Sequence, residues 1–537
     1  MHASKDSEPR PAVLAAVLAL CLLPLAAVVT PKPNDIWFIL AYGRGLSSMQ
    51  SFPHTDFLTF HTDFHLVIQQ WLYDVAEWRI WEAFGAAGIL AGVVLSSAFL
   101  GWTVWKRLRL ASDGWRIPLL AVIASGIMSF GRADARPSAI SAPLLMLLLI
   151  TLDSMKRRLA RNGEGEPMHA AEALRTVAPN LIAVAAISVL MSNIHASMLP
   201  MCWLICLASA VGNLRIWEGV PFLAGRIEHN RVMAAASAAC IPLSFAASLA
   251  NPYGIEAPLY TMFGTSDIIS SFITEMRPLW DTAASPMPTI VLLSAFLLSV
   301  LAIMLWSVSS SLRRGGRVRL DQVAIALGMC LLQALHLRGL FTLGCVGLTS
   351  ALMSGTSPRA LESARSRFIM AFCVMLSWAS SLTVAAQSGC VPGFLSTMSG
   401  EVRAAGAAEA IIADGGGAGD RVYCDFEAGS YLEFMGLPVY ADPRAEVLCK
   451  PLNGQYDVLE ELAAATPGTE SGIACGADLI GKWDFDYVAG LRGSGVIGAI
   501  EEGRVAGYEL LSSYSWSEMM DAGTYADLEM AVYRKAR

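Results

Sequence analysis

Acidic and histidine residues gather with aromatic side chains in one polar segment near the amino terminus, residues 31–82. Its carboxylates include Asp35, Asp56, Asp63, Asp74 and Glu77, and its imidazoles are His54, His61 and His65. A carboxylate can take a proton from an attacking hydroxyl group or contact a divalent metal ion. Asp35 is the first candidate for either role, and the alternative is a helix cap or a solvated acid. The imidazoles lack the spacing of a zinc site.

Polar residues also divide three pairs of short apolar runs, 117–152, 178–213 and 320–354. The tips between the paired runs carry Arg132, Asp134 and Arg136, then Asn193 and His195, and finally His336 and Arg338. A run of about 15 residues rises only ~22 Å as a helix, less than the ~30 Å hydrocarbon thickness of a bilayer. Either the tips line a recessed, wet cavity, or they reach the interface, where Arg snorkels at little cost.

Long apolar runs fill residues 1–386 and place these polar groups relative to a membrane. The runs are 12–30, 83–105, 117–131, 137–152, 178–192, 197–213, 232–250, 289–308, 320–336, 339–354 and 368–386. Run 12–30 lacks a good cleavage site and is interpreted as a retained helix rather than a signal peptide. Lys and Arg concentrate in alternate connecting segments, which predicts a cytoplasmic amino terminus, about 11 membrane helices and an outer carboxy terminus.

Composition supports a membrane protein. The 537 residues are 55% hydrophobic and only 15% charged, whereas a soluble protein is about 25% charged. No basic stripe or zinc-finger spacing indicates nucleic-acid binding. We therefore predict a mainly α, multi-pass protein of the cell (plasma or inner) membrane, whose transmembrane domain spans residues 1–386. Its first outer loop is 31–82, where residues 66–80 have helical spacing and are predicted to lie flat on the membrane surface.

The residues after 386 are typical of a water-soluble protein. Residues 387–400 are predicted to be a linker, and 401–537 a small extracytoplasmic α/β domain. Helices are expected over 401–413 and 454–465, and strands over 421–424, 439–441, 472–475, 485–489 and 528–533. Cys390, Cys424, Cys449 and Cys475 permit disulfides without defining a pairing. We expect this domain to recognise an acceptor or cover the cavity, and Asp425, Asp442 and Arg444 to form structural ion pairs.

Short motifs follow one another along nearly the whole chain. They are Asn34-Asp35-Ile36-Trp37, Gly43-Arg44, Pro53-His54-Thr55-Asp56, Gln70-Trp71-Leu72, Arg136-Pro137, Asn193-Ile194-His195-Ala196, Asn251-Pro252-Tyr253-Gly254, Glu275 in an I-x-E-x-x-P setting, and, in the last third, Asp425, Gly429-Ser430-Tyr431-Leu432 and Asp442-Pro443-Arg444. In this order they resemble a group of bacterial membrane proteins related to the GT-C membrane glycosyltransferases. Gln70 and Ala196 depart from that group's pattern, which has Glu and Gly there.

The resemblance implies transfer of a sugar from a polyprenyl-phosphate-linked donor to a glycan, lipid or protein acceptor on the outer face of the membrane. Asp35 would be the general base or a metal contact, with Asp56 second. Arg136 and Arg338 would hold the donor phosphate, because a guanidinium suits phosphate geometry. Asn193 and His195 would hydrogen-bond sugar or phosphate oxygens. Glu275 would be either a ligand or an ion-pair partner of Arg277. The turn Asn251–Gly254 is interpreted as a helix ending.

Two other classes of protein remain open. A transporter is expected to have internal repeats and charges near mid-membrane, whereas this sequence has a long acidic first loop. A non-catalytic scaffold whose outer domain binds a partner is compatible with the loss of Glu at Gln70. The only cofactor that the sequence suggests is a divalent metal, with Asp35 as its candidate contact.

Overall fold

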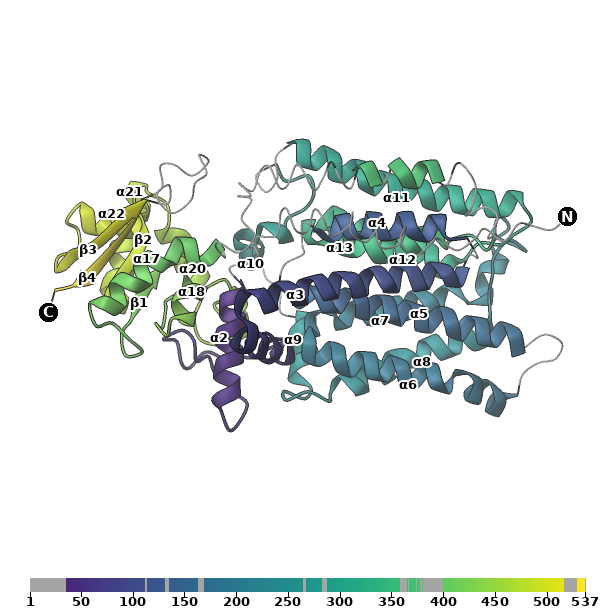
Figure 1. Cartoon of the computed structure of the whole chain (residues 1–537), viewed down its shortest axis with the longest axis horizontal. Coiled ribbons are helices and arrows are strands. Elements are labelled where there is room, and N and C mark those ends of the chain that lie inside the picture. The colour runs from purple at the N-terminus through teal and green to yellow at the C-terminus, as the bar shows by residue number, and fades with distance from the viewer. Residues whose placement is uncertain are drawn as a thin grey trace.

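The computed structural model describes residues 35–111, 114–130, 135–162, 169–263, 267–282, 287–357, parts of 365–379, 399–515 and 529–536. The predicted helix 12–30, the tip residues Arg132 and Asp134, Cys390 and nearly all of the predicted linker lie outside these residues. Figure 1 shows a long bundle of helices with a smaller, sheet-containing part beyond one end. We call this smaller part, residues 399–536, the tail.

Apolar helices make up the bundle. They are α3 (Trp71–Ala111), α4 (Arg116–Phe130), α5 (Ser138–Asn162), α6 (Ala170–Ile194), α7 (Leu199–Gly212), α8 (Arg231–Ser248), α11 (Met287–Arg313), α12 (Leu320–Leu335), α13 (Leu340–Thr342) and α14 (Leu348–Leu352). Within the described residues, α3, α5, α6, α8 and α11 are long and apolar enough to cross a membrane. Each predicted run from 83 to 336 coincides with one of these helices, and the run 339–354 is helical across α13, the π-helical turn η5 (Leu343–Gly347) and α14. The predicted total of about 11 crossings stays a prediction.

Helix α3 is two helices that meet at a break. Gly85 has φ 59° and ψ −151° inside it, a left-handed conformation that glycine adopts without steric cost. The part before the break, 71–84, includes most of the segment predicted as a flat helix over 66–80. That prediction starts too early, because residues 66–70 precede the helix. The part after the break, 86–111, continues along the bundle (Figure 1).

Short helices cover the end of the bundle next to the tail (Figure 1). They are α2 (Asp35–Ser48), α9 (Glu256–Phe263), α10 (Asp267–Phe272) and the 3-10 turns η1 (Ala196–Met198), η3 (Thr274–Met276) and η4 (Leu337–Gly339). Helix α2 crosses α3 so closely that a Cβ added at Gly43 would overlap the carbonyl oxygen of Asp74. The glycine of the Gly43-Arg44 motif is therefore needed for helix packing.

The tail has a four-stranded sheet and several helices. Its elements are α17 (Ser399–Ala413), β1 (Val422–Cys424), α18 (Gly429–Phe434), α19 (Lys450–Asn453), α20 (Val458–Ala465), α21 (Glu470–Trp483), β2 (Tyr487–Leu491), α22 (Gly495–Glu501), β3 (Tyr508–Ser515) and β4 (Glu529–Lys535). The strand order is β1-β2-β4-β3. Strand β1 runs parallel to β2, and β4 pairs antiparallel with both β2 and β3. Helices and strands therefore alternate in an α/β arrangement.

Two predicted strands of the tail are wrong. Residues 472–475 belong to helix α21, which starts where the Thr469 hydroxyl accepts a hydrogen bond from Gly472 N at 3.2 Å. Gly476, directly after this segment, is a packing site, since a Cβ added there would overlap the Gly495 carbonyl of α22. Residues 439–441 form isolated bridges, from Val439 to Val422 and to Thr59, rather than a strand of the sheet.

The first loop and the tail share one hydrophobic core. Phe64, Leu66, Val67 and Ile68 of the loop are at most 4% exposed and pack in the same cluster as tail residues such as Tyr440 and Leu448. Main-chain contacts reinforce this core: Thr59 bridges Val439, and His65 N donates to Asn453 O at 3.2 Å. Residues that lie almost 400 positions apart in sequence therefore form one packing unit.

The described cysteines of the tail are free thiols. Cys424, Cys449 and Cys475 form no disulfide with one another. Cys424 is fully buried, and its thiol donates to the carbonyl of Ala441 at 3.4 Å. Cys424 and Cys449 are small buried groups of the core, and Cys475 is partly buried.

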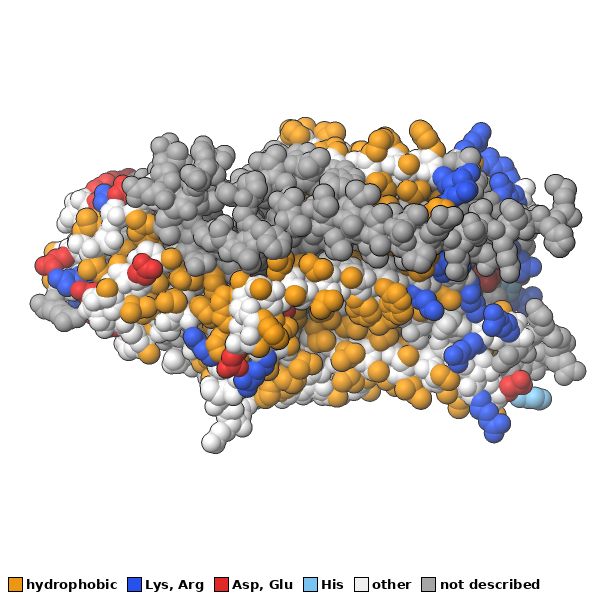
Figure 2. Space-filling model, viewed as in Figure 1, with side chains coloured by type: hydrophobic (Ala, Val, Ile, Leu, Met, Phe, Trp, Pro, Cys, Tyr) orange, Lys and Arg blue, Asp and Glu red, His pale blue; other side chains and the backbone are white. Residues whose placement is uncertain are grey.

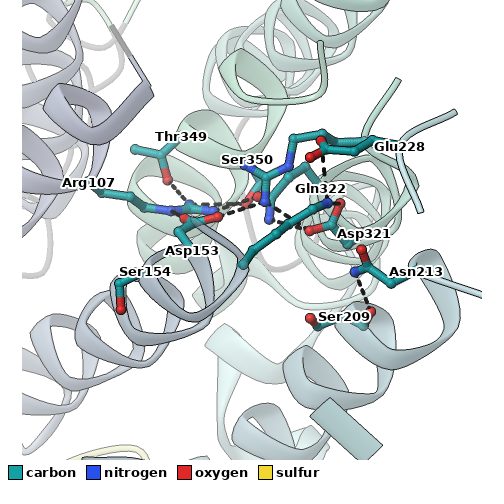
Figure 3. Close-up of polar contacts among 12 residues, drawn as sticks. Arg107, Asp153, Ser154, Ser209, Asn213, Glu228, Asp321, Gln322, Thr349 and Ser350 are labelled. Atoms are coloured by element: carbon teal, nitrogen blue, oxygen red, sulfur yellow. Dashed lines mark hydrogen bonds and ion pairs between the residues drawn. The ribbon is translucent and has the colours of Figure 1, made fainter. Parts of the chain in front are cut away.

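A network of polar side chains lies near the end of the bundle away from the tail, where α3 ends. Figure 3 shows Arg107 of α3 beside Asp153 of α5, with Gln322, Thr349 and Ser350 around the same guanidinium. Arg107 is fully buried, and its Nε donates to Asp153 Oδ2 at 3.1 Å. This network connects helices that are distant in sequence.

Candidate active site

A partly buried cluster of ion pairs lies at the end of the bundle next to the tail. Arg136 Nε lies 2.8 Å from Asp35 Oδ2. Its Nη1 lies 3.2 Å from each carboxylate oxygen of Glu275. The three side chains are 22%, 26% and 34% exposed, respectively, so solvent and a ligand can reach them. Two carboxylates that are 240 residues apart in sequence therefore share one guanidinium.

Helix starts and turns position these three groups. Asp35 is the first residue of α2, and Glu275 lies in the η3 turn. Arg136 precedes α5, and its carbonyl accepts a hydrogen bond from Ala139 N at 3.0 Å, while the carbonyl of Pro137 accepts from Ile140 N at 3.1 Å and Ser141 N at 3.0 Å. Proline fits a helix start because its missing N–H has no partner to lose there. The Arg136-Pro137 motif thus fixes the position of the Arg136 side chain at the start of α5.

The turn η4 brings Arg338 to the same place. His336 Nδ1 lies 2.7 Å from Met276 O, and Leu337 N donates to Arg277 O at 3.0 Å. These bonds join the segment that carries Arg338 to the segment that carries Glu275. Arg277 itself lies 3.5 Å from Asp281. In the described structure Glu275 pairs with Arg136 rather than with Arg277, and its role as a ligand stays a prediction.

His195 lies beside the start of α5, between α6 and η1. Its Nδ1 is 2.9 Å from the hydroxyl of Ser141. Burial lowers the pKa of His195 to about 3, and the positive charge of Arg338 acts in the same direction. The imidazole is therefore neutral at physiological pH and contributes hydrogen bonds rather than charge.

The side chain of Asn193 forms structural hydrogen bonds between neighbouring segments and does not face the site. Its Oδ1 accepts from Trp71 Nε1 at 2.7 Å, and its Nδ2 donates to Val189 O at 2.7 Å and to Ala250 O at 2.9 Å. These bonds join the start of α3, the end of α6 and the turn after α8. Next to it, Ala196 is fully buried in an ordinary backbone conformation. The methyl group that replaces glycine there is accommodated.

The turn Asn251–Gly254 ends helix α8, as the sequence indicates. Asn251 Nδ2 donates to Ser248 O and Gly254 O, and Gly254 has φ 53°. The hydroxyl of Tyr253 donates to Pro53 O at 3.0 Å. This turn therefore also fastens the first loop to the bundle.

Asp56, the second catalytic candidate, lies in a different cluster. Its Oδ1 is 2.6 Å from Arg444 Nη1, and its Oδ2 accepts from Thr59 N and Thr59 Oγ1 at 3.0 and 2.6 Å. Burial alone would raise the pKa of Asp56, but Arg444 and the hydrogen bonds from Arg444 and Thr59 hold it below its usual value. Asp56 is 2% exposed. The structure thus places it in the contact between loop and tail, away from Asp35.

The tail also brings a carboxylate that the sequence did not single out. Glu446 follows the Arg444 segment by two residues. Burial raises the pKa of Glu446, and the charges of Asp442 and Asp35 add to the rise. Burial raises the pKa of Tyr260 in α9, and the charge of Glu446 adds to that rise. Glu446 therefore lies within electrostatic reach of the candidate catalytic residue, although nothing in its sequence context signals this.

The described residues offer no ready metal site. Within them, no group of three or more His, Cys, Asp or Glu side chains is gathered to hold a metal ion. The two carboxylates that do converge, Asp35 and Glu275, have the Arg136 guanidinium between them. In this arrangement the two carboxylates bind a guanidinium group.

Comparison with known proteins gives matches at the level of structure. No protein-family model and no curated protein sequence matches the chain. The oligosaccharyltransferase AglB of Archaeoglobus fulgidus, in complex with an inhibitory peptide and a dolichol-phosphate, superposes with a TM-score of 0.58 at 12% identity, over 89% of this chain and 69% of that one. Its apo form gives 0.57 at 14% identity, over 90% and 70%. ArnT of Cupriavidus metallidurans, bound to undecaprenyl phosphate, gives 0.50 at 12% identity, over 97% of both chains.

These matches cover the bundle and the tail together. The chain has the fold of the GT-C membrane glycosyltransferases, which confirms the resemblance inferred from its motifs. Together with its five long apolar helices, this fold identifies a membrane protein. Identities of 12–14% carry the fold and not the activity.

Proposed function

We propose that the chain is a membrane glycosyltransferase that moves a sugar from a polyprenyl-phosphate-linked donor to an acceptor on the outer face of the membrane. The observation that supports it best is the convergence of Asp35, Arg136 and Glu275 at one end of the bundle, beside Arg338 and His195. A carboxylate next to exposed guanidinium groups suits proton removal from an acceptor beside a bound phosphate.

The orientation is part of this proposal. Lys and Arg side chains gather at the end of the bundle away from the tail (Figure 2), and basic residues favour the cytoplasmic side. The protein would then be a multi-pass protein of the cell membrane, with about 11 helices, a cytoplasmic amino terminus and the tail outside. In this arrangement the candidate site opens on the outer side, where the first loop and the tail meet.

The proposed reaction assigns a step to each group. The oxygen of an acceptor hydroxyl attacks the anomeric carbon of the sugar, and Asp35 takes its proton. The bond between that carbon and the phosphate oxygen breaks, and polyprenyl phosphate leaves with the electron pair. Arg136 and Arg338 stabilise the negative charge that develops on the leaving phosphate. Neutral His195 donates or accepts a hydrogen bond at the sugar. Glu275 holds Arg136 when no phosphate is bound.

Arg136 has a second role in this scheme. While it pairs with Asp35, its positive charge stabilises the carboxylate and weakens it as a base. A donor phosphate competes for the same guanidinium through two parallel hydrogen bonds. Donor binding thereby releases Asp35 to act as a base, which couples proton removal to the presence of donor.

The structural neighbours support a lipid phosphate as the ligand. AglB was solved with a dolichol-phosphate and ArnT with undecaprenyl phosphate. Both ligands join a phosphate to a long polyprenyl chain. We infer that the present chain takes a ligand of the same chemistry.

The test uses purified protein in lipid nanodiscs with a panel of polyprenyl-phosphate sugars, and it measures release of free polyprenyl phosphate. We expect Asp35→Asn to lower the rate at least about 100-fold, within the usual range for loss of a general base. Asp63→Asn is the matched control, because Asp63 is an exposed acid of the same loop. Equal rates in Asp35→Asn and the unsubstituted protein would refute the assignment, and no turnover of any donor by folded protein would favour a scaffold.

A further inference from the structure

One guanidinium of the tail holds the amino-terminal part of the chain at two points. Arg444 is 2% exposed and lies among acidic side chains of the tail: its Nε donates to Asp442 Oδ1 at 2.9 Å and its Nη2 to Glu433 Oε1 at 3.1 Å. Its Nη1 contacts Asp56 of the first loop and the hydroxyl of Tyr42 in α2. Both outer nitrogens and Nε are therefore engaged, and the residue cannot be replaced without leaving buried acids unpaired.

Tyr42 connects this contact to the candidate site. It lies in the same helix as Asp35, seven residues later. Seven residues make about two helical turns, so Tyr42 lies on the same face of α2 as Asp35 and about 10 Å along it. A rigid helix transmits the position of one residue to the other. The position of Arg444 in the tail is thus linked to that of the Asp35 carboxylate.

The tail meets α2 at a second place, close to Asp35. The ring of Trp37 lies 4.9 Å from those of Tyr431 and Phe434 in α18, measured between centroids. Trp37 is 2% exposed. Gly43, which also belongs to α2, packs against α3. Helix α2 is therefore held between the bundle and the tail, and neither part alone determines its position.

We propose that Arg444 is a positioning residue of the active site, which fixes α2 through Tyr42 and Asp56 and so holds Asp35 against Arg136. The tail is then a constituent of the catalytic centre and not only a cover or an acceptor-binding domain. This inference rests on the proposed function for its catalytic part, whereas the mechanical link between Arg444 and α2 stands independently of it.

The experiment compares Arg444→Met, Arg444→Lys and Tyr42→Phe in nanodiscs by amide hydrogen exchange and by donor turnover. The matched control is Arg534→Met, which removes another arginine of the tail whose partners, Asp414 and Glu509, also lie in the tail. We expect Arg444→Met to speed exchange in residues 35–48 about tenfold or more while residues 470–491 keep their protection. Arg444→Lys retains the charge and should lie between it and the unsubstituted protein.

Kinetics separate positioning from binding. If Arg444 positions Asp35, Arg444→Met lowers kcat at least about tenfold, since small misplacements of a catalytic group are costly. The KM for donor stays within about threefold. Tyr42→Phe keeps the ring and removes one hydroxyl, so a smaller change in the same direction is expected even if Arg444→Met folds poorly. Arg534→Met should leave exchange in residues 35–48 and kcat unchanged.

The possible outcomes distinguish failure of the positioning proposal from failure of the proposed glycosyl transfer. Unchanged exchange in residues 35–48 for both Arg444→Met and Tyr42→Phe would overturn the positioning proposal. The same would follow if Arg534→Met had the effect of Arg444→Met. If the unsubstituted protein turns over no donor but Arg444→Met loosens residues 35–48, the proposed glycosyl transfer fails and the link between tail and α2 is upheld.

Discussion

At the scale of single residues, His61 shows how strongly the loop is built into the tail. It is 3% exposed, stacks on Phe64 with ring centroids 4.5 Å apart, and its Nε2 lies 3.0 Å from Tyr440 O. Burial lowers the pKa of His61 from 6.5 to about 4. The folded protein therefore keeps this imidazole neutral at pH values where an unfolded chain would protonate it.

This shift predicts a pH dependence with a definite sign. Between about pH 6.5 and 4 the unfolded state binds more protons at His61 than the folded state, so stability falls as pH falls, by about 2 kcal/mol at pH 5. We expect His61→Phe to lose less stability than the unsubstituted protein between pH 8 and pH 5, as measured by the midpoint of thermal unfolding. His54→Phe, at a side chain that is 57% exposed, is the control. Parallel pH profiles for His61→Phe and the unsubstituted protein would contradict this prediction.

The predicted site residues fall into two groups: those that the structure brings together near Asp35, and those whose side chains are bonded elsewhere. Asp35, Arg136, His195, Glu275 and Arg338 do converge. The sequence indicates Arg136, His195 and Arg338 by their place at the tips and Asp35 by its place after the first apolar run, whereas Glu275 is indicated only by the family resemblance. The functional roles of these residues stay predictions. Asp56 and Asn193 also stand out in the sequence as polar residues of a loop and a tip. In the structure, however, their side chains form hydrogen bonds with groups that are distant in sequence. Asp56 meets Arg444 across 388 positions, and no local pattern encodes such a contact.

At the scale of elements, the crossing of α2 and α3 depends on one missing side chain. We expect Gly43→Ala to destabilise the protein by about 1–3 kcal/mol, the usual cost of overpacking, because its methyl group would overlap Asp74 O and Trp78 Cβ. Donor turnover should fall as well, since Asp35 lies on the displaced helix. Gly92→Ala in α3 is the control, because no atom lies within 4 Å of its added Cβ. The measurements are the unfolding midpoint and the turnover rate, and equal effects of the two substitutions would disprove the packing argument.

Apolar helices were predictable because hydrophobicity is a local property. Every predicted run from 83 to 354 became a helix, whereas the segment 472–475 did not become a strand. The adjacent Gly476 allows a helix–helix contact with Gly495 of α22, which lies 19 positions away. Helix α2 was not assigned from the sequence, and it is the element whose position depends most on distant parts of the chain.

At the scale of the whole molecule, a charge network fastens the far end of the bundle. Buried Arg107 pairs with Asp153, which also pairs with Arg319 at 2.7 Å, and Arg319 lies 2.9 Å from Asp321 (Figure 3). In the sequence, Arg107 and Arg319 are only two of the Lys and Arg residues of the basic connecting segments, because burial of a basic residue at a helix end has no sequence signal. The network joins α3 and α5 with the start of α12, which are far apart in the chain.

Removal of one member should be costly. We expect Arg107→Met to lower stability by about 3–5 kcal/mol, because it leaves Asp153 buried with fewer partners. Lys106→Met is the matched control, since the neighbouring Lys106 is exposed. The readouts are the yield of monodisperse protein in detergent and its unfolding midpoint. A normal yield and midpoint for Arg107→Met would show that the network is not a support of the bundle.

The shared core of loop and tail has a consequence for the synthesis of the protein. His61 and its partner Tyr440 are 379 positions apart, and a ribosome adds ~5–20 residues per second, so the loop waits roughly 20–75 s for the tail. During that interval Phe64 and Leu66 lack the surface that covers them in the finished protein. A chain that stops before the tail would carry this uncovered loop permanently and be a target for proteolytic quality control. Late truncations should therefore be as damaging to protein abundance as early ones.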